Sequence, residues 1–480
     1  HVEANKRAID IMSGQSGGTT VINLYGSDSV MSLETPQEHS YVVQTDNDVN
    51  SVFEDYKDAI YSKFIVYFYG NIHIEGGGIK KYPNFSFIGY GSKLIIAPLN
   101  ENYDTAIFVV PFDSDTSKMI SHKNTEIAGF ELDGNYLGQE KNTSGNYTFG
   151  LYGCGINAEK FNTDLVSYSD MQFMTDLTVR DCYIHDFIRS GVVAGRGWLV
   201  ENCRFKNSPT DHGLYITAGK NITCRDVTFE GYFDRGALVV GGPNKLYQED
   251  PPENILVERC NFYNATGDRP IHVRGHFPNT NYPCKNIILR DVYIKYDDTV
   301  TVPPPSTLVI GQVDSASMNE NILVQNLVIE GNIKNSALIT IIDSSAVKIV
   351  NAVINIKKTS NEQPLINIKY TMPGGYKTLL LRDVDINIDS DAVTEDVIRF
   401  NVDDNLINEC EGVCIENSRI NASTATVSNL FAAKSNGLFS GNDEEFTMFN
   451  TILSSTSGNV SVLSNTSLIE FSEKNKLNLQ

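Results

Sequence analysis

The sequence predicts an all-β protein folded as a parallel β-solenoid, in which one chain winds through similar coils. From about residue 120 a six-residue phrase recurs. Its first position is apolar, its second is variable and its third is usually Asn or Asp; a small apolar residue, another variable residue and then Ile or Phe follow. A second β-rich run follows each copy, such as "GLYITAG" (213–219) and "GALVVGG" (236–242). Because no helical spacing separates the runs, each repeat supplies two or three strands that stack on those of its neighbours.

The spacing of the copies indicates a fixed coil that carries loops of variable length. Typical copies are "VENCRF" (200–205), "VERCNF" (257–262) and "LRDVYI" (289–294). Their small apolar position recurs at intervals of 21 to 35 residues, so the shortest interval sets the coil and the excess forms loops. The residues at this position are Cys182, Cys203, Val227, Cys260, Val292, Leu327, Ala352, Val384 and Ser418.

Two kinds of repeated position are predicted to be structural. Equivalent residues of stacked coils lie about 4.8 Å apart, so Cys182, Cys203 and Cys260 should share one inward row and Cys224 another. We expect these cysteines to be small buried hydrophobes, reduced and unreactive. The Asn or Asp before the small apolar position should stack at a turn and bond neighbouring backbone groups. Cys410 and Cys414 are close enough to pair, and the sequence leaves their state open.

The sequence predicts four segments, in which the two ends of the chain cap the solenoid. Residues 1–45 are an N-terminal extension, and residues 46–120 hold a short capping helix and the first strands. In "DVNSVFEDYKDAIYSK" (48–63) the apolar residues lie on one helical face, which would cover the open edge of the first coil. Residues 121–425 form the coils, and residues 426–480 form C-terminal strands or a cap.

Charge and composition exclude several classes of partner. The formal net charge is −21 at pH 7, and a surface of this sign repels nucleic acid and anionic membranes. No apolar run reaches the ~18 residues of a membrane span. The eight cysteines do not form the CxxC pairs of a zinc site. We therefore expect no nucleic-acid or membrane partner, no metal-ligand residues and no cofactor, with a divalent metal left open.

The order of motifs is "YGNIHI" (69–74), "FIGYGSKL" (87–94), "FELDGN" (130–135) and then coils bearing "DHGLYI" (211–216). Over roughly residues 45 to 430 it resembles the tailspikes and appendages of bacteriophages, and more distantly the pectate-lyase-like superfamily. The resemblance implies a right-handed, single-stranded parallel β-helix. It also implies a homotrimer of the extracellular virion tail that binds and cleaves capsule, O-antigen or teichoic acid. The NTD, DD, GHG and RIK set of polygalacturonases and the calcium cluster of pectate lyases are missing.

The second strands place acidic and basic residues at one predicted corner. "TDHG" (210–213), "FDRG" (233–236) and "GDRP" (267–270) align on successive coils. Carboxylates on adjacent coils would lie about 5 Å apart, the separation found in retaining glycosidases. Carboxylates two coils apart would lie roughly 9.5 Å apart, near the upper limit of the separation in inverting glycosidases. The aligned rows are Arg189, Asp211, Asp234 and Asp268; Ser190, His212, Arg235 and Arg269; and Val193, Tyr215, Leu238 and His272.

These rows lead to a hypothesis of glycopolymer hydrolysis. Asp211, Asp234 and Asp268 would do acid/base work, and the arginines would bind an anionic sugar or a phosphodiester. The predicted substrate-binding residues are Arg189, His212, Tyr215, Arg235, Arg269, His272 and Arg274. A purely structural alternative is a stack of cross-coil ion pairs. Asp133 and Glu140 in "FELDGNYLGQE" (130–140) are a rival pair, although an Asp-Gly-Asn turn explains that stretch better. Alternative functions are a teichoic-acid phosphodiesterase, a polysaccharide lyase and a non-catalytic glycan-binding adhesin.

Overall fold

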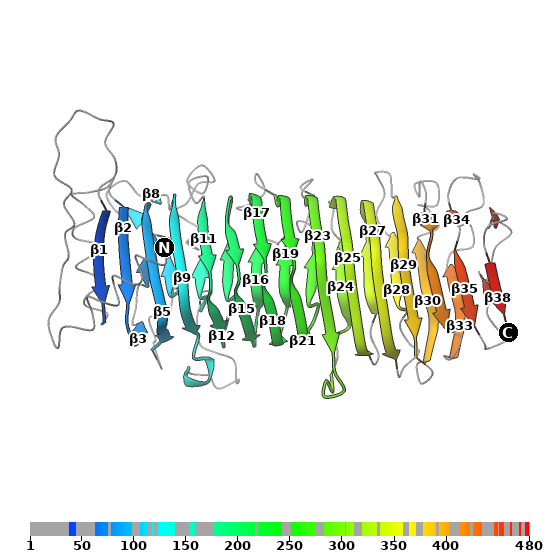
Figure 1. Cartoon of the computed structure of the whole chain (residues 1–480), viewed down its shortest axis with the longest axis horizontal. Helices are drawn as coiled ribbons and strands as arrows, with labels where there is room; N and C mark the ends of the chain where they lie inside the picture. The colour runs from blue at the N-terminus through cyan, green and yellow to red at the C-terminus, as the bar shows by residue number, and fades with distance from the viewer. Residues whose placement is uncertain are drawn as a thin grey trace, which may run out of the picture.

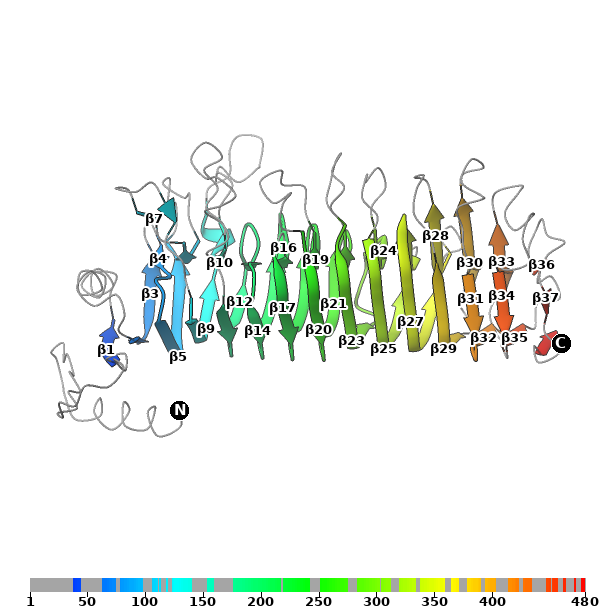
Figure 2. The ribbon, with the colours of Figure 1, turned by 90° about the horizontal axis from the view of Figure 1, so that it is seen from above.

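The strands of the protein stack in chain order along one long axis. The structure is a computed structural model, and Figure 1 shows the strands following one another from β1 to β38. Figure 2, turned by 90°, shows the same order from above. The described residues are 38–44, 63–74, 78–97, 106–110, 112–113, 118–119, 123–139, 153–158, 176–216, 219–241, 251–274, 283–302, 304–311, 319–333, 337–358, 364–370, 378–389, 393–402, 413–422, 426–433, 446–449, 451–455, 461–462, 470–471 and 476–479.

Two parallel sheets run along this axis, a 23-stranded sheet A and a 13-stranded sheet B. From β2 to β36, each coil places one long strand or two short strands in sheet A and one strand in sheet B. Sheet A contains β1 (Glu38–Val43), β2 (Lys63–Phe68), β3 (Asn71–Ile74), β5 (Phe85–Ile96), β9 (Thr125–Asp133), β11 (Leu177–Arg180), β12 (Tyr183–His185), β14 (Leu199–Glu201), β15 (Arg204–Ser208), β17 (Lys220–Arg225), β18 (Thr228–Phe233), β20 (Glu253–Glu258), β21 (Asn261–Gly267), β23 (Lys285–Tyr296), β25 (Asn319–Ile333), β27 (Ser344–Lys358), β29 (Leu379–Ile388), β31 (Val413–Glu416), β32 (Arg419–Ala422), β34 (Phe446–Phe449), β35 (Ile452–Ser455), β37 (Glu470–Phe471) and β38 (Lys476–Leu479).

Sheet B is made of the second β-rich run of each coil. Its strands are β4 (Ile79–Lys80), β6 (Phe108–Val109), β10 (Ile156–Asn157), β13 (Val192–Ala194), β16 (His212–Ile216), β19 (Gly236–Val240), β22 (Ile271–Val273), β24 (Ser306–Ile310), β26 (Ala337–Ile342), β28 (Ile366–Tyr370), β30 (Val393–Val402), β33 (Thr426–Ala433) and β36 (Ser461–Val462). Outside the two sheets, the described residues include an antiparallel pair, β7 (Phe112–Asp113) with β8 (Lys118–Met119), and a 3₁₀ turn at Tyr136–Gly138.

The predicted repeat is confirmed in register. Strand β23 pairs with β25, and β25 with β27, so that Val292, Leu327 and Ala352 lie side by side. Inside the stack, the rings of Phe205, Phe229 and Phe262 lie one above another, with centroids 5.1 and 4.7 Å apart. The core is therefore built from the same position of successive coils, as parallel stacking requires.

The cysteines of the repeat are buried thiols, as predicted. Cys182, Cys203 and Cys260 are at most 3% exposed. Burial raises the pKa of the Cys203 thiol well above its ordinary value, which keeps the sulfur protonated and unreactive. The Cys224 and Cys260 sulfurs approach to 3.8 Å, so the two predicted inward rows meet in the core. Cys410 lies outside the described residues.

The predicted row of Asn and Asp residues forms a ladder of hydrogen bonds between side chains. Asn326 has a left-handed backbone, with φ of 55°, which Asn and Asp tolerate better than most residues. Its Nδ2 donates to Asp291 Oδ1 at 2.6 Å, and its Oδ1 accepts from Asn351 at 2.7 Å. The ladder bonds of Asn326 thus run to neighbouring side chains, whereas we expected bonds to backbone groups. Arg259 interrupts the ladder and pairs with Asp226 at 2.8 Å.

Parallel pairing extends beyond the predicted coil segment in both directions. Strand β1 already pairs with β2, and β35 pairs with β38 near the C-terminus. The predicted capping helix falls on residues 48–63, of which only Lys63 is described, as the first residue of β2. Within the described part of the chain, no helix is long and apolar enough to cross a membrane.

Candidate functional site

The predicted site lies where the chain passes from sheet A into sheet B. Asp211 directly precedes β16, Arg235 directly precedes β19, and Arg269 stands two residues before β22. A glycine is needed at this corner because the chain packs tightly there. A Cβ on Gly213 would lie 2.6 Å from the Ala237 oxygen and 2.9 Å from the Phe233 ring. Gly213 therefore lets adjacent coils approach at the point where the polar side chains leave the stack.

The register at this corner corrects the predicted row of three carboxylates. The backbone amide of Asp268 donates to the backbone carbonyl oxygen of Asp234 at 3.0 Å, so these two residues are neighbours on adjacent coils. Asp211, however, is the neighbour of Arg235: the backbone amide of Arg235 donates to the backbone carbonyl oxygen of Asp211 at 3.2 Å. The reason is one extra residue in the first coil: Ser208 pairs with Phe233, but His212 pairs with Gly236.

The neighbouring predicted row needs a smaller correction. Val193 pairs with Tyr215, and Tyr215 pairs with Val239 rather than with Leu238. Val239 in turn pairs with His272, so Tyr215 and His272 share a row as predicted. Arg189 belongs to the preceding corner, where its carbonyl accepts a hydrogen bond from Ser208 at 2.7 Å.

Asp211 is the most enclosed carboxylate of the predicted three. Its side chain is 12% exposed, against 43% for Asp268, which pairs with Arg269 at 3.3 Å. Ser190 Oγ donates to Asp211 Oδ2 at 3.0 Å, and His212 Nε2 lies 3.2 Å from Oδ1. Asp234 is reached by a different donor, the Tyr232 hydroxyl at 2.8 Å. The three acids therefore occupy three distinct environments.

His212 is a buried imidazole with one nitrogen to spare. Burial lowers its pKa, and the nearby Asp211 carboxylate opposes this shift only in part, so the ring is neutral near pH 7. The ring packs against Tyr215, with centroids 4.4 Å apart. Nδ1 is buried and has no hydrogen-bond partner among the described residues. A buried polar atom of this kind is costly unless a ligand or water satisfies it.

Positive charge gathers around Asp211 and His212. His272, whose Nε2 donates to the Gly311 oxygen at 3.0 Å, has a pKa lowered well below its ordinary value, by burial and then by Arg269 and Arg274. Burial also lowers the pKa of Arg274, and repulsion from Arg269 and Arg235 adds to the shift. The Arg274 guanidinium thus lies near two others and near two neutral imidazoles, on a chain with a net charge of −21.

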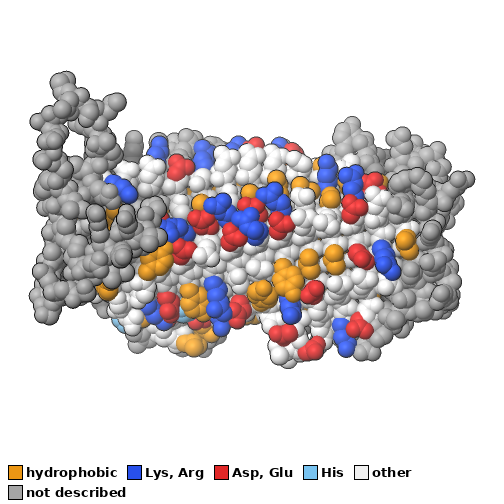
Figure 3. Space-filling model, viewed as in Figure 1, with side chains coloured by type: hydrophobic (Ala, Val, Ile, Leu, Met, Phe, Trp, Pro, Cys, Tyr) orange, Lys and Arg blue, Asp and Glu red, His pale blue; other side chains and the backbone are white. Residues whose placement is uncertain are grey.

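The outer face of sheet A shows a different pattern of charge. Figure 3 shows basic and acidic side chains intermixed on the face that it displays. On sheet A, arginines face acids of an adjacent coil: Arg225 lies 2.6 Å from Glu201, and Arg290 lies 2.5 Å from Glu258. These cross-coil ion pairs lie on sheet A and not at the corner for which the structural alternative was stated; there, Asp211 pairs with His212 and Asp268 with Arg269, which are their neighbours in sequence. The sheet A pairs stabilise the surface modestly and leave no excess of one sign.

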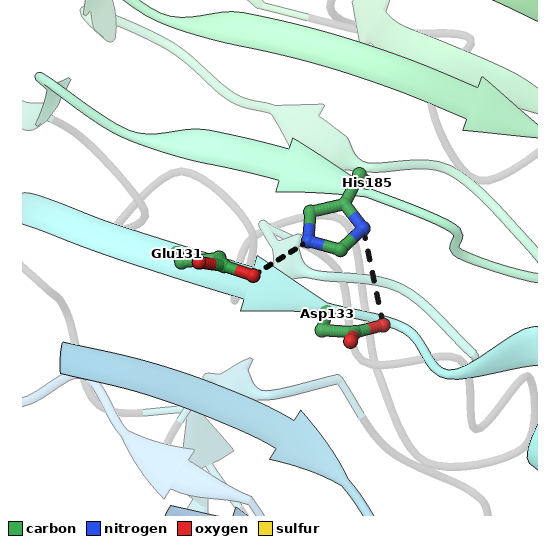
Figure 4. A group of neighbouring side chains, drawn as sticks. All are labelled: Glu131, Asp133 and His185. Carbon is green, nitrogen blue, oxygen red and sulfur yellow. Dashed lines mark hydrogen bonds and ion pairs between the residues drawn. The ribbon is translucent and has the colours of Figure 1, made fainter. Parts of the chain in front are cut away.

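A second polar cluster, on sheet A, was largely missed by the sequence reasoning. Along β9 the side chains of Glu131 and Asp133 point outward, and on the next coil Tyr183 pairs with Glu131 and His185 with Asp133. Figure 4 shows the His185 ring between the two carboxylates. Aligning "FELD" (130–133) with "CYIH" (182–185) would have revealed it. Of the rival pair, Asp133 belongs to this cluster, and Glu140 lies outside the described residues.

Ion pairs tie this cluster together. His185 Nε2 lies 3.2 Å from Glu131, and Nδ1 lies 2.8 Å from Asp186 and 3.9 Å from Asp133. Burial opposes protonation of His185, but the surrounding carboxylates outweigh it and raise its pKa. Lys93 Nζ contacts Asp133 at 2.7 Å and Glu131 at 2.9 Å. Burial raises the pKa of Glu131, but its contacts with Lys93 and His185 outweigh burial and lower that pKa.

Comparisons with known proteins establish the fold. No family model and no curated protein sequence matches the chain. Among solved structures, a tailspike protein double mutant of E. coli bacteriophage HK620 is similar at 12% identity, with 90% of this chain and 76% of that chain covered and a TM-score of 0.51. This likeness, together with the parallel register, makes the chain a parallel β-helix protein.

Two further structures are similar at lower scores. The A-module of a mannuronan C-5 epimerase from Azotobacter vinelandii has 12% identity, coverage of 90% of this chain and 94% of that chain, and a TM-score of 0.48. The catalytic domain of a GH87 α-1,3-glucanase in complex with tetrasaccharides has 13% identity, coverage of 84% and 66%, and a TM-score of 0.47.

Proposed function

We propose that the chain binds and hydrolyses a bacterial surface glycopolymer that carries negative charge. The observation that supports this most is the gathering of Arg235, Arg269 and Arg274 beside Asp211 on a strongly acidic protein. Guanidinium groups recognise carboxylates and phosphates by paired, charge-assisted hydrogen bonds. An anionic polymer would bind to the arginines of this corner, whereas the acidic surface of the rest of the protein would repel it.

Asp211, Asp234 and Asp268 would share the acid/base chemistry. With the corrected register, Asp234 and Asp268 are the pair on adjacent coils, and strands stacked about 4.8 Å apart suit the ~5–5.5 Å carboxyl separation of a retaining glycosidase. Asp211 would then act from the enclosed position beside Ser190. His212, neutral near pH 7 and with the proton on the Nε2 that faces Asp211, would accept a hydrogen bond from a sugar hydroxyl at Nδ1. His272 would contribute to the binding surface without adding charge.

The biological setting is a proposal by resemblance. The HK620 tailspike protein has been solved in complex with a pentasaccharide, and the glucanase with tetrasaccharides. By analogy we place the protein on the virion tail, outside the cell, as a homotrimeric, right-handed β-helix with an N-terminal capping helix. Capsular polysaccharide or teichoic acid would be its partner on the host. Arg189 and Tyr215 would line the binding surface next to the arginines.

The test is to incubate the protein with purified capsular polysaccharide and with teichoic acid. Hydrolysis should release new reducing ends and shorten the polymer on size-exclusion chromatography. Asp234→Asn and Asp268→Asn should each lose at least about 100-fold in rate, since each would remove one member of the carboxylate pair. Glu201→Gln, on sheet A, is the matched control and should keep full activity. Equal cleavage by wild type and by the Asp211→Asn, Asp234→Asn and Asp268→Asn variants would refute the site.

The alternative functions give different products. A teichoic-acid phosphodiesterase, which the arginines and histidines of the corner also suit, would release phosphate monoesters and no reducing ends. A lyase would give unsaturated sugar ends that absorb in the ultraviolet. A non-catalytic adhesin would bind the polymer in a pull-down and leave its length unchanged.

A further inference from the structure

We propose that Glu131, Asp133 and His185 form a binding site for a divalent transition-metal ion on the outer face of sheet A. The carboxylate oxygens and the imidazole nitrogen that would serve as ligands all lie within 4.8 Å of one another. This cluster is on sheet A and is not the corner that carries the proposed glycopolymer site. The inference is therefore independent of the proposed function.

The three ligands are held by the strand geometry of adjacent coils. Alternation along β9 directs Glu131 and Asp133 to the same side, and the parallel pairing of β12 with β9 sets His185 directly beside Asp133 (Figure 4). His185 Nε2 and Glu131 Oε1 are 3.2 Å apart, which matches the separation of two ligands bound to one ion at about 2.1 Å each. Glu131, with a side chain 40% exposed, has room to turn toward the ion once its contact with Lys93 is broken.

His185 is prepared for this role by a carboxylate behind it. Nδ1 lies 2.8 Å from Asp186 Oδ2, and Asn207 in turn donates to Asp186 Oδ1 at 3.2 Å. Donation from Nδ1 to Asp186 would persist when an ion binds, so Nε2, which faces Glu131, is the nitrogen that would give up its proton and turn its lone pair to the ion. A carboxylate that holds a histidine in this way is the usual outer partner of a metal-bound imidazole. The Tyr183 ring, stacked on His185 at 4.4 Å, fixes the plane of the ring.

The ligand types select the kind of ion. Imidazole favours zinc and its neighbours in the transition series over magnesium and calcium, which prefer oxygen alone. Three protein ligands leave a coordination position open, as in the zinc sites that keep a bound water. Lys93 is the competitor, because its ammonium contacts both carboxylates. Its side chain is 26% exposed, so it can turn into solvent when an ion binds.

The experiment is calorimetric titration of the full, chelator-treated protein with Zn²⁺, and then with Mg²⁺. Wild type should bind Zn²⁺ much more tightly than Mg²⁺. His185→Gln should weaken Zn²⁺ binding at least about 100-fold, and Asp186→Asn about 10- to 100-fold. Lys93→Met should tighten binding several-fold, because it removes the competing ammonium. This gain separates a site at the cluster from any other zinc contact.

Glu230→Gln is the matched control, since Glu230 lies on the same outer face two coils further on, in register through Lys206 with His185. Its Zn²⁺ affinity should equal that of wild type, and circular dichroism should show that every variant is folded. Equal Zn²⁺ affinity of wild type and His185→Gln, or weaker binding by Lys93→Met, would overturn the proposal.

Discussion

Acidification should destabilise the protein through His272, in sheet B. The ring is 2% exposed and lies beside His212, Arg269 and Arg274, and burial and the two arginines hold its pKa well below the ordinary value. Below about pH 6.5 the unfolded chain therefore takes up a proton that the folded chain does not. The free energy of unfolding consequently falls as the pH drops, at about 1.4 kcal/mol per pH unit for this group.

Between about pH 6.5 and about pH 5.0 the loss from His272 is at most about 2 kcal/mol, the value for a ring that stays neutral in the folded protein over the whole interval. His185 acts with the opposite sign: its pKa is raised in the folded protein, so its stabilisation is complete below about pH 6.5 and is lost as the pH rises through the folded value. Comparison with a His272→Gln variant isolates the effect, because glutamine can still donate to the Gly311 oxygen.

The assay is urea unfolding of wild type and His272→Gln at about pH 7.5 and about pH 5.0. Wild type should lose more stability than the variant across this interval, by up to about 2 kcal/mol. If both proteins lose the same stability, the ring is protonated in the folded state and the assigned burial effect is wrong.

Three further changes test the packing of the coils by urea unfolding. Gly213→Ala should cost about 1–3 kcal/mol, because its Cβ would meet the Ala237 oxygen at 2.6 Å, whereas Gly153→Ala, with 3.4 Å to its nearest neighbour, should cost far less. Phe229→Ala should cost about 3–5 kcal/mol by removing the middle ring of the core stack, and a loss below 1 kcal/mol would contradict that stack. Asn326→Ala should cost about 1–3 kcal/mol, and Asn326→Gly should recover the part due to its left-handed backbone but not the two ladder bonds.

The stack of coils could be predicted because parallel stacking repeats its demands. Every coil of the repeat must place apolar side chains at the same inward positions, as Phe229 does at one position and Cys203 at another. Every coil must also take a left-handed step at the same place, which Asn326 and its neighbours accept. These requirements recur along the chain, so they leave a pattern in the sequence that survives loops of very different length.

The candidate site was only partly predictable, because its corner obeys no such repeat. The approach of Asp211 to Arg235 rather than to Asp234 depends on one extra residue between Ser208 and His212, and nothing periodic marks an insertion at a turn. The sheet A cluster was missed because Glu131 and His185 are 54 residues apart, and the stretch "AGFEL" (128–132), which holds Glu131, matches the repeated phrase only weakly.

The sequence by itself determined the winding of the chain, its inward rows and its ladder of Asn and Asp side chains, since hydrogen bonding and core packing impose the same residue types on every coil. Only the tertiary structure decided which polar side chains face one another outside the core. Those contacts depend on the length of each turn and on the register of adjacent coils, and both are set locally where the repeat is interrupted.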